Sequence, residues 1–108
     1  MGKTNKVNII AGLHKVFNYE SIAVSTTIVS LTASKYTDTD GDMAKRCVIK
    51  VENGQLRYRM DGENPTATEG MLLNPMDILV ILGTQNIENF RAIRKTSTDS
   101  KIFVQYEI

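Results

Sequence analysis

Three aspartates at alternate positions offer the most familiar metal-binding chemistry in the sequence. YTDTDGDM contains Asp38, Asp40 and Asp42, and carboxylate oxygens are the ligands that calcium prefers. A calcium loop of the EF-hand type that started at Asp38 would need glycine at its sixth position and glutamate at its twelfth, where the chain has Met43 and Ile49. The pattern favours a solvated loop, cation binding at the three aspartates stays open, and we expect no cofactor.

Nucleophilic chemistry has little support in the sequence. The chain has one histidine, His14, and one cysteine, Cys47. No pattern places a serine or cysteine nucleophile beside His14, and Cys47 lies in an alternating apolar stretch that is typical of a small buried residue. Residues 2–4 read GKT, like the end of a phosphate-binding loop, but the preceding strand and glycine are missing. We therefore predict a protein that is not an enzyme and has no catalytic residues.

Basic side chains form a more promising group. Two arginines alternate on one expected strand, and three basic residues lie on another: Arg57, Arg59, Arg91, Arg94 and Lys95. Guanidinium groups bind phosphates and carboxylates through forked hydrogen bonds. Single-strand nucleic-acid binding usually adds interleaved aromatic rings, and here these are limited to Tyr58 and Phe90. The group favours a solvated face or a protein interface, and we expect no nucleic-acid partner.

The acidic passage YRMDGENPTATEG, at residues 58–70, reads as a turn. Asp61 and Gly62 suit a tight turn, and Pro65 fixes its own backbone while keeping the residue before it extended. The acidic side chains of this passage have no histidine beside them in the sequence, so a general acid and base pair is not indicated. We expect Asp61, Gly62 and Pro65 to have structural roles.

The positions that frame this passage alternate between apolar and polar side chains, as β-strands do. The alternation runs through residues 45–52 and 55–60, and Asn53 and Gly54 lie between the two runs. Asn-Gly is the strongest short signal for a tight β-hairpin, because both central residues of that turn need positive φ. The sequence predicts a hairpin with turn residues Asn53 and Gly54 and with one apolar face made of Cys47, Ile49, Val51, Leu56, Tyr58 and Met60.

Further strands are expected at several places, with no strong helix. The expected strands are 22–25, 27–31, 78–82 as a run buried on both sides, 89–95 and 101–107, with a weaker one at 7–11. Residues 12–21 read as a loop or a short helical turn. In the last strand Ile102, Val104 and Tyr106 share one face and Phe103 lies on the other, which makes Phe103 a candidate for contact with a partner.

The length and composition fit one soluble domain. The chain has 108 residues, 42% of them hydrophobic and 23% charged, with a formal net charge of +1, so no strong overall field draws it to nucleic acid or to a membrane. No apolar run reaches the ~18 residues of a membrane span. Short strands between frequent turns predict an all-β fold, a compact antiparallel β-sandwich of the jelly-roll or immunoglobulin-like type with about seven or eight strands. We expect residues 1–108 to form one domain, with residues 1–6 as a candidate flexible arm.

Several motifs in the second half form a recognisable set. The runs GQLRYRMDGENPTATEGMLL and NPMDILVILGTQNIENFRAIRKTSTDSKIFVQYE, with AVSTTIVSLTASKY upstream, resemble a recurring pattern in small structural proteins of tailed phages and prophages. The pattern combines a tyrosine–arginine strand, D-G-x-x-P-T-A, N-I-x-x-F-x-A-I-R and a terminal aromatic strand, over about residues 20–107. This chain departs from it at Pro75 and Met76, where a small polar turn is expected.

The resemblance implies a β-rich virion component made in the cytoplasm of the bacterial host. The expected function is that of an auxiliary or decoration (cement) protein of the capsid. Alternatives are a tail, neck or fibre-attachment component and a receptor- or carbohydrate-binding module. Expected partners are other virion proteins and further copies of the chain in a homo-oligomer or symmetric lattice. Strand alternation gives the candidate contact residues Arg57, Arg59, Arg91, Arg94 and Phe103.

Overall fold

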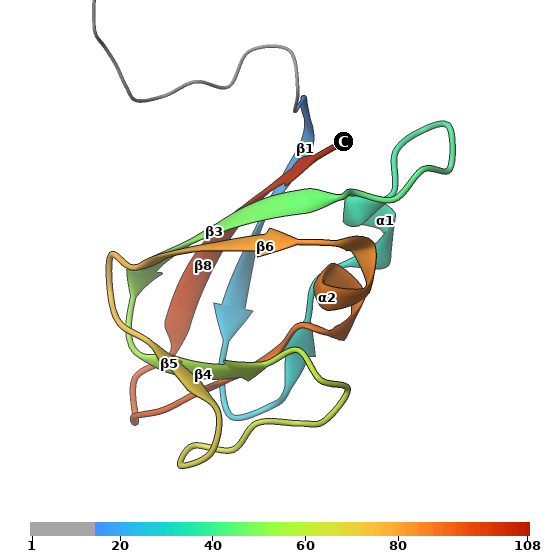
Figure 1. Cartoon of the computed structure of the whole chain (residues 1–108). Coiled ribbons are helices and arrows are strands. Elements are labelled where there is room, and N and C mark those ends of the chain that lie inside the picture. Colours follow the sequence, from blue (N-terminus) through green and yellow to red (C-terminus); the bar gives the residue numbers. More distant parts are fainter. Residues whose placement is uncertain (1–14) are drawn as a thin grey trace, which may run out of the picture.

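Two antiparallel sheets of four strands each pack face to face in the computed structural model, which describes residues 15–108 (Figure 1). Sheet A has the order β1 (Val16–Val24), β8 (Ser100–Glu107), β3 (Arg46–Asn53) and β6 (Ile78–Leu82). Sheet B has the order β2 (Val29–Ser30), β7 (Arg91–Arg94), β4 (Leu56–Arg59) and β5 (Met71–Leu73). The predicted all-β sandwich is confirmed. The candidate arm at 1–6, the weak strand at 7–11 and His14 lie outside the described residues.

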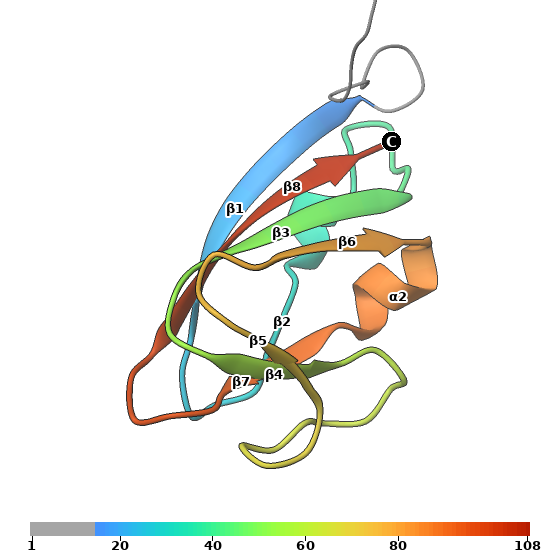
Figure 2. The same cartoon turned by 60° about the vertical axis from the view of Figure 1, so that its left-hand side comes forward.

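The path of the chain between the sheets gives the sandwich its topology (Figure 2). Successive strands alternate between sheets A and B, except that β4 is followed by β5 in the same sheet. Eight strands in two four-stranded sheets with this order make a jelly roll, in which the strands of each sheet are far apart in the sequence. Of the two sandwich types that the sequence left open, the structure has the jelly roll.

The predicted hairpin at Asn53 and Gly54 is wrong. The strand before these residues, β3, lies in sheet A and the strand after them, β4, lies in sheet B, so the Asn-Gly pair joins the two layers. Of the two residues only Gly54 has a positive φ, at 73°. A Cβ atom at Gly54 would lie 2.8 Å from the carbonyl oxygen of Asp99. Gly54 is therefore needed mainly because another backbone segment passes against it.

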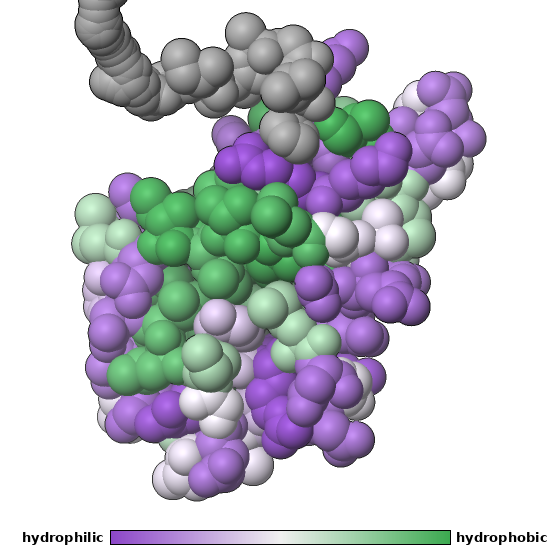
Figure 3. All heavy atoms as spheres, in the orientation of Figure 1, coloured by the Kyte–Doolittle hydropathy of each residue, from purple (hydrophilic) through white to green (hydrophobic). Residues whose placement is uncertain are grey.

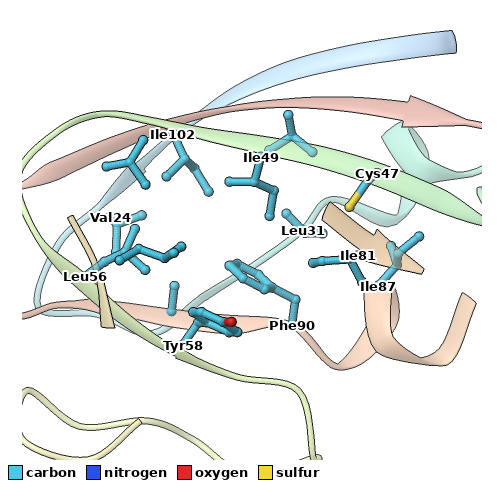
Figure 4. Close-up of a cluster of buried hydrophobic side chains, with 14 of the residues drawn as sticks. Val24, Leu31, Cys47, Ile49, Leu56, Tyr58, Ile81, Ile87, Phe90 and Ile102 are labelled. Atoms are coloured by element: carbon cyan, nitrogen blue, oxygen red, sulfur yellow. The ribbon is translucent and has the colours of Figure 1, made fainter. Parts of the chain in front are cut away.

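The core lies between the sheets and is built by the inward faces of the strands (Figure 4). The expected apolar face is confirmed at its buried members Cys47, Ile49, Val51, Leu56 and Tyr58, whereas Met60 is half-buried. Ile102, Val104 and Tyr106 of β8 are also buried, as their spacing predicts. Within sheet B, Tyr58 of β4 stacks on Phe90, which directly precedes β7, with ring centroids 5.5 Å apart. Burial raises the pKa of the Cys47 thiol to about 12, which makes this cysteine part of the packing.

Strand β1 contradicts the expectation of a loop or helical turn at residues 12–21, because residues 16–21 belong to this strand. Its inward side includes Glu20, whose polar side chain obscures the apolar alternation in the sequence. The Glu20 carboxylate accepts hydrogen bonds from the Tyr106 hydroxyl at 2.5 Å, the Thr32 hydroxyl at 2.7 Å and the Thr32 backbone N–H at 3.1 Å. These bonds satisfy a charged group at a half-buried strand position.

Two short helices lie in connections between strands, although no strong helix was expected. They are α1 (Ala33–Tyr36) and α2 (Thr84–Asn89), and α2 places Ile87 in the core. The expected strand at 27–31 is shorter than predicted, with only Val29–Ser30 paired, to β7. No helix in the described residues is long and apolar enough to span a membrane.

Candidate interaction surface

Strand β6 has an exposed apolar outer face at the edge of sheet A. The exposed fractions of Ile78, Val80 and Leu82 are 61%, 44% and 62%, while Ile81 faces the core and is buried. The expectation that residues 78–82 are buried on both sides is therefore wrong. A run of five apolar residues is typical of a strand that is buried on both faces. In this structure sheet B covers only one face of β6.

The turn before β6 adds an exposed methionine in a strained conformation. Asp77 N–H donates to the Asn74 carbonyl at 3.0 Å, and Pro75 and Met76 occupy the corners of this turn. Met76 is the one non-glycine residue with positive φ in the described chain, at 74°, a corner where this type of turn normally has glycine. Its side chain is 63% exposed. The position thus combines a backbone strain of ~1–2 kcal/mol with an exposed apolar side chain.

The strands beside β6 extend its outer face. The register places Val48 of β3 between Val80 of β6 and Gln105 of β8. Farther across, Phe103 of β8 stacks on Tyr19 of β1, with ring centroids 6.2 Å apart and ring planes 11° apart. Phe103 is thus on the outer face, as expected, and is half-covered by its neighbours. The face passes from aliphatic residues on β6 to an aromatic pair near β1.

A space-filling view shows hydrophobic residues gathered over the region of β6 and β3, with a smaller group lower on the same side, toward β5 (Figure 3). The exposed large apolar residues of β5 are Met71 and Leu72, at 62% and 39%. Scattered exposed apolar residues are ordinary, but a contiguous patch marks an interaction site. We define the interaction surface as Met76, Ile78, Val80 and Leu82.

The arginines expected to contact partners have internal hydrogen bonds in the described structure. Arg57 donates to the carbonyl oxygens of Ala67 at 3.1 Å and Gly70 at 2.9 Å. Arg91 donates to the carbonyl oxygen of Gly62 at 2.9 Å and to Asn64 Oδ1 at 3.0 Å. These guanidinium groups hold the connection between β4 and β5 against sheet B, because loop carbonyls need partners when they are partly buried.

Two other arginines pair with nearby aspartates. Arg59 donates to both carboxylate oxygens of Asp61, at 3.0 and 2.5 Å. This hydrogen bonding lowers the pKa of Asp61 from 3.8 to about 2. Arg94 donates to Asp99 at 2.5 Å, in the turn between β7 and β8. Strands β4 and β7 are neighbours, as predicted, and Arg59 lies opposite Arg91, whereas Arg94 lies opposite the buried Leu56. A contact role for these arginines stays a prediction.

The connection at residues 60–70 is a structured turn, as the sequence predicts. Gly62 has φ 88°, and the Asp61 carboxylate accepts the Glu63 backbone N–H at 3.3 Å. Pro65 is buried, and the Thr66 hydroxyl accepts the backbone N–H of Glu69 at 2.9 Å. A hollow of about 560 Å³ lies beside this loop and is lined by Arg59, Met60, Asp61, Glu69, Gly70 and Met71. The loop turns β4 back to β5, its antiparallel neighbour.

The aspartate-rich loop is organised by hydrogen bonds to its own backbone. The Asp38 carboxylate accepts the backbone N–H groups of Asp40 at 2.9 Å and Asp42 at 2.8 Å, which is the usual role of aspartate in a turn. Within residues 15–108 no three potential metal-ligating side chains come together.

Sequence reasoning missed the interaction surface because residues 78–82 lack the polar alternation that identifies a half-exposed strand. One signal for this surface was present in the sequence. At Pro75 and Met76 the chain departs from the pattern of the virion proteins that it resembles, because a large apolar residue stands where a small polar turn is expected. Comparisons of the chain with protein-family models, with curated proteins and with solved structures give no match.

Proposed function

We propose that this protein is a non-enzymatic structural subunit of a bacteriophage particle, an auxiliary or decoration protein that binds and cements neighbouring capsid subunits. The motifs that resemble small virion proteins suggest the particle. Jelly rolls are common in capsid proteins, although they also occur in lectins and enzymes, so the fold is support by analogy.

The observation that favours a binding function is Met76. A glycine at this corner would relieve the backbone strain, and a polar residue would remove the exposed apolar side chain. A residue that is unfavourable in both respects is explained if its side chain contacts a partner. Met76 also lies two residues before Ile78, the first of the other residues of the interaction surface.

The free energy that a neighbour would gain by covering these side chains is of a size that suits repeated weak contacts. Full burial of one large aliphatic side chain is worth ~1.5–3 kcal/mol. Ile78 and Leu82 are about 60% exposed, so a neighbour that covered them would gain roughly 1–2 kcal/mol from each. Contacts of this strength become effective when symmetry repeats them across a particle.

A binding comparison with particles that lack the protein tests the proposal. The double variant Met76→Asn/Ile78→Thr keeps residues suited to the turn and the strand and removes the apolar side chains, so it should fold and lose at least tenfold in particle affinity. Val16→Thr is the matched control, because Val16 is 42% exposed on β1, the opposite edge strand of sheet A. Equal binding of both variants and the parent protein would reject the interaction surface.

A carbohydrate-binding module is a second candidate, favoured by the aromatic pair. Tyr19 is 50% exposed and stacks on Phe103 on the outer face of sheet A, and exposed aromatic rings are common platforms for sugars. A glycan array with the purified protein separates the candidates. Saturable binding that Tyr19→Ala abolishes would favour the sugar module, whereas the cement proposal predicts no glycan signal. A tail, neck or fibre-attachment site would use the interaction surface in the same way as a capsid site.

A further inference from the structure

We infer that the open edge of β6 pairs with β6 of a second copy of this chain, antiparallel and related by a two-fold axis at Val80. The inference names one neighbour for the interaction surface and rests on the proposed assembly function for its biological setting. The physical argument comes from the edge itself.

The edge presents backbone groups that can extend sheet A. Ile81 pairs with Cys47 and Leu79 with Ile49 of β3, and the Gly83 N–H donates to the Lys45 carbonyl at 2.7 Å. This alternation directs the N–H and C=O groups of Leu79 and Ile81 toward β3, and those of Ile78, Val80 and Leu82 away from it. Within the described residues no strand pairs with that outer side of β6.

The short helix after β6 does not occupy this edge. Helix α2 packs against β3 as well as β6 and buries Ile87 in the core, so it lies on the inner side of the sheet. Its contact with the edge is at the end of β6, where Asn86 Nδ2 donates to the Leu82 carbonyl at 2.9 Å. The backbone groups of Ile78 and Val80 remain available.

The two edges of sheet A differ in protection. Natural edge strands discourage pairing with charges, prolines or bulges. Strand β1 has Glu20 in its middle and a register irregularity near Asn18, whereas β6 reads ILVIL with none of these features. An unprotected edge beside an exposed apolar face indicates that β6 is paired in the working assembly.

A second copy fits this edge because β6 is symmetric about its centre. Val80 is the middle of the five residues. A two-fold axis at Val80 therefore places all five residues opposite residues of β6 in the second copy. Val80 then lies opposite Val80 of the second copy and Ile78 lies opposite Leu82, all of them apolar cross-strand pairs. The two Val80 residues exchange backbone hydrogen bonds, and each Leu82 N–H donates to the partner's Ile78 carbonyl.

The contact is small, which sets its strength. Five residues span ~17 Å of strand, and pairing over that length buries less than the ~1,200 Å² of a typical stable interface. We therefore expect a weak dimer in solution that becomes stable when a symmetric particle supplies further contacts.

Disulfide trapping tests the pairing directly. In a Cys47→Ala background, Val80→Cys places two thiols at directly opposite positions with Cα atoms ~5.5 Å apart, within the ~4.4–6.8 Å that a disulfide needs. Mild oxidation of the purified protein should convert most of it to covalent dimer. Ala23→Cys is the control, because Ala23 is exposed on the opposite edge strand of the same sheet. The inference is wrong if Val80→Cys gives no more dimer than Ala23→Cys.

The register gives a second test that does not depend on Val80. Chains with Ile78→Cys and chains with Leu82→Cys should form mixed disulfide dimers when combined, and at least fivefold fewer dimers when oxidised separately. Equal yields in the three samples would overturn the two-fold register. Particle binding is measured on the same proteins, so a protein that binds particles without forming the Val80→Cys dimer would refute the pairing and leave the proposed function standing.

Discussion

Replacement of Gly54 by alanine should destabilise the protein far more than the same replacement at Gly62. Both glycines have positive φ, at 73° and 88°, so an alanine at either position has a conformational cost of ~1 kcal/mol. A Cβ at Gly62 meets no heavy atom within 4 Å, whereas at Gly54 it would lie 2.8 Å from the Asp99 carbonyl oxygen and 2.9 Å from the Ser100 Cα. Of these two glycines, only Gly54 is in contact with another backbone segment.

The close approach adds to the cost at Gly54 because two backbone segments must separate. Overpacking of this kind costs ~1–3 kcal/mol, which gives a total of ~3 kcal/mol for Gly54→Ala against ~1 kcal/mol for Gly62→Ala. A change of 1 kcal/mol shifts the Tm of a domain of this size by roughly 4–8 °C. Thermal unfolding followed by circular dichroism should therefore show a Tm lower by ~12–24 °C for Gly54→Ala and by ~4–8 °C for Gly62→Ala.

The difference in Tm between the two variants also shows whether Asn53 and Gly54 form a tight hairpin or a crossing between the two sheets. In a tight hairpin Gly54 would lie at an exposed corner, and alanine would have only the conformational cost. Equal Tm shifts for the two variants would therefore refute the crossing between sheets and the packing of Gly54 against the strand that begins at Ser100.

Three further predictions concern individual side chains. Ser100 Oγ is buried without a hydrogen-bond partner in the described structure, so Ser100→Ala should raise the free energy of unfolding by ~1 kcal/mol in urea titrations; a loss of that size would imply an overlooked partner. The Cys47 thiol is buried and has a raised pKa of about 12, so a thiol reagent at pH 8 should modify it only in denaturant, and rapid modification of native protein would contradict its burial. Arg59→Gln should return the pKa of Asp61, measured by NMR, from about 2 toward 3.8, and an unchanged pKa would show that Arg59 is not the cause. Because the folded-state pKa is the lower one, the stabilisation from this pair is present above pH 3.8 and is lost as the pH falls toward 2.

The strands and the inward faces were predictable where apolar and polar residues alternate. Cys47 and Ile49 on β3 and Val104 on β8 are buried as their spacing indicates, because a strand with one covered face sorts its side chains by parity. The turn at Asp61 and Gly62 was predictable for a similar local reason, since its hydrogen bonds are made between neighbours in the chain.

The remaining features depend on contacts between distant segments. Asn53 and Gly54 have the composition of a hairpin, and only the pairing of β3 with β6 and β8 shows that the chain crosses between layers. Glu20 breaks the apolar alternation of its strand. The sequence does not show why this is tolerated, because the hydrogen-bond partner Tyr106 is 86 residues away. Alternation correctly placed Arg57 and Arg59 on one face of β4. The sequence does not show that Arg57 and Arg91 bind loop carbonyls, or that Arg59 and Arg94 pair with aspartates.

A reconstruction of the proposed phage particle would test the central claim most directly, because it would show what covers the interaction surface. We predict that Met76, Ile78, Val80 and Leu82 are buried against neighbouring protein subunits, while the loop at residues 60–70 keeps its bonds to Arg57 and Arg91. A particle in which these four side chains face solvent and the neighbours bind elsewhere, or one that lacks the protein, would contradict the claim.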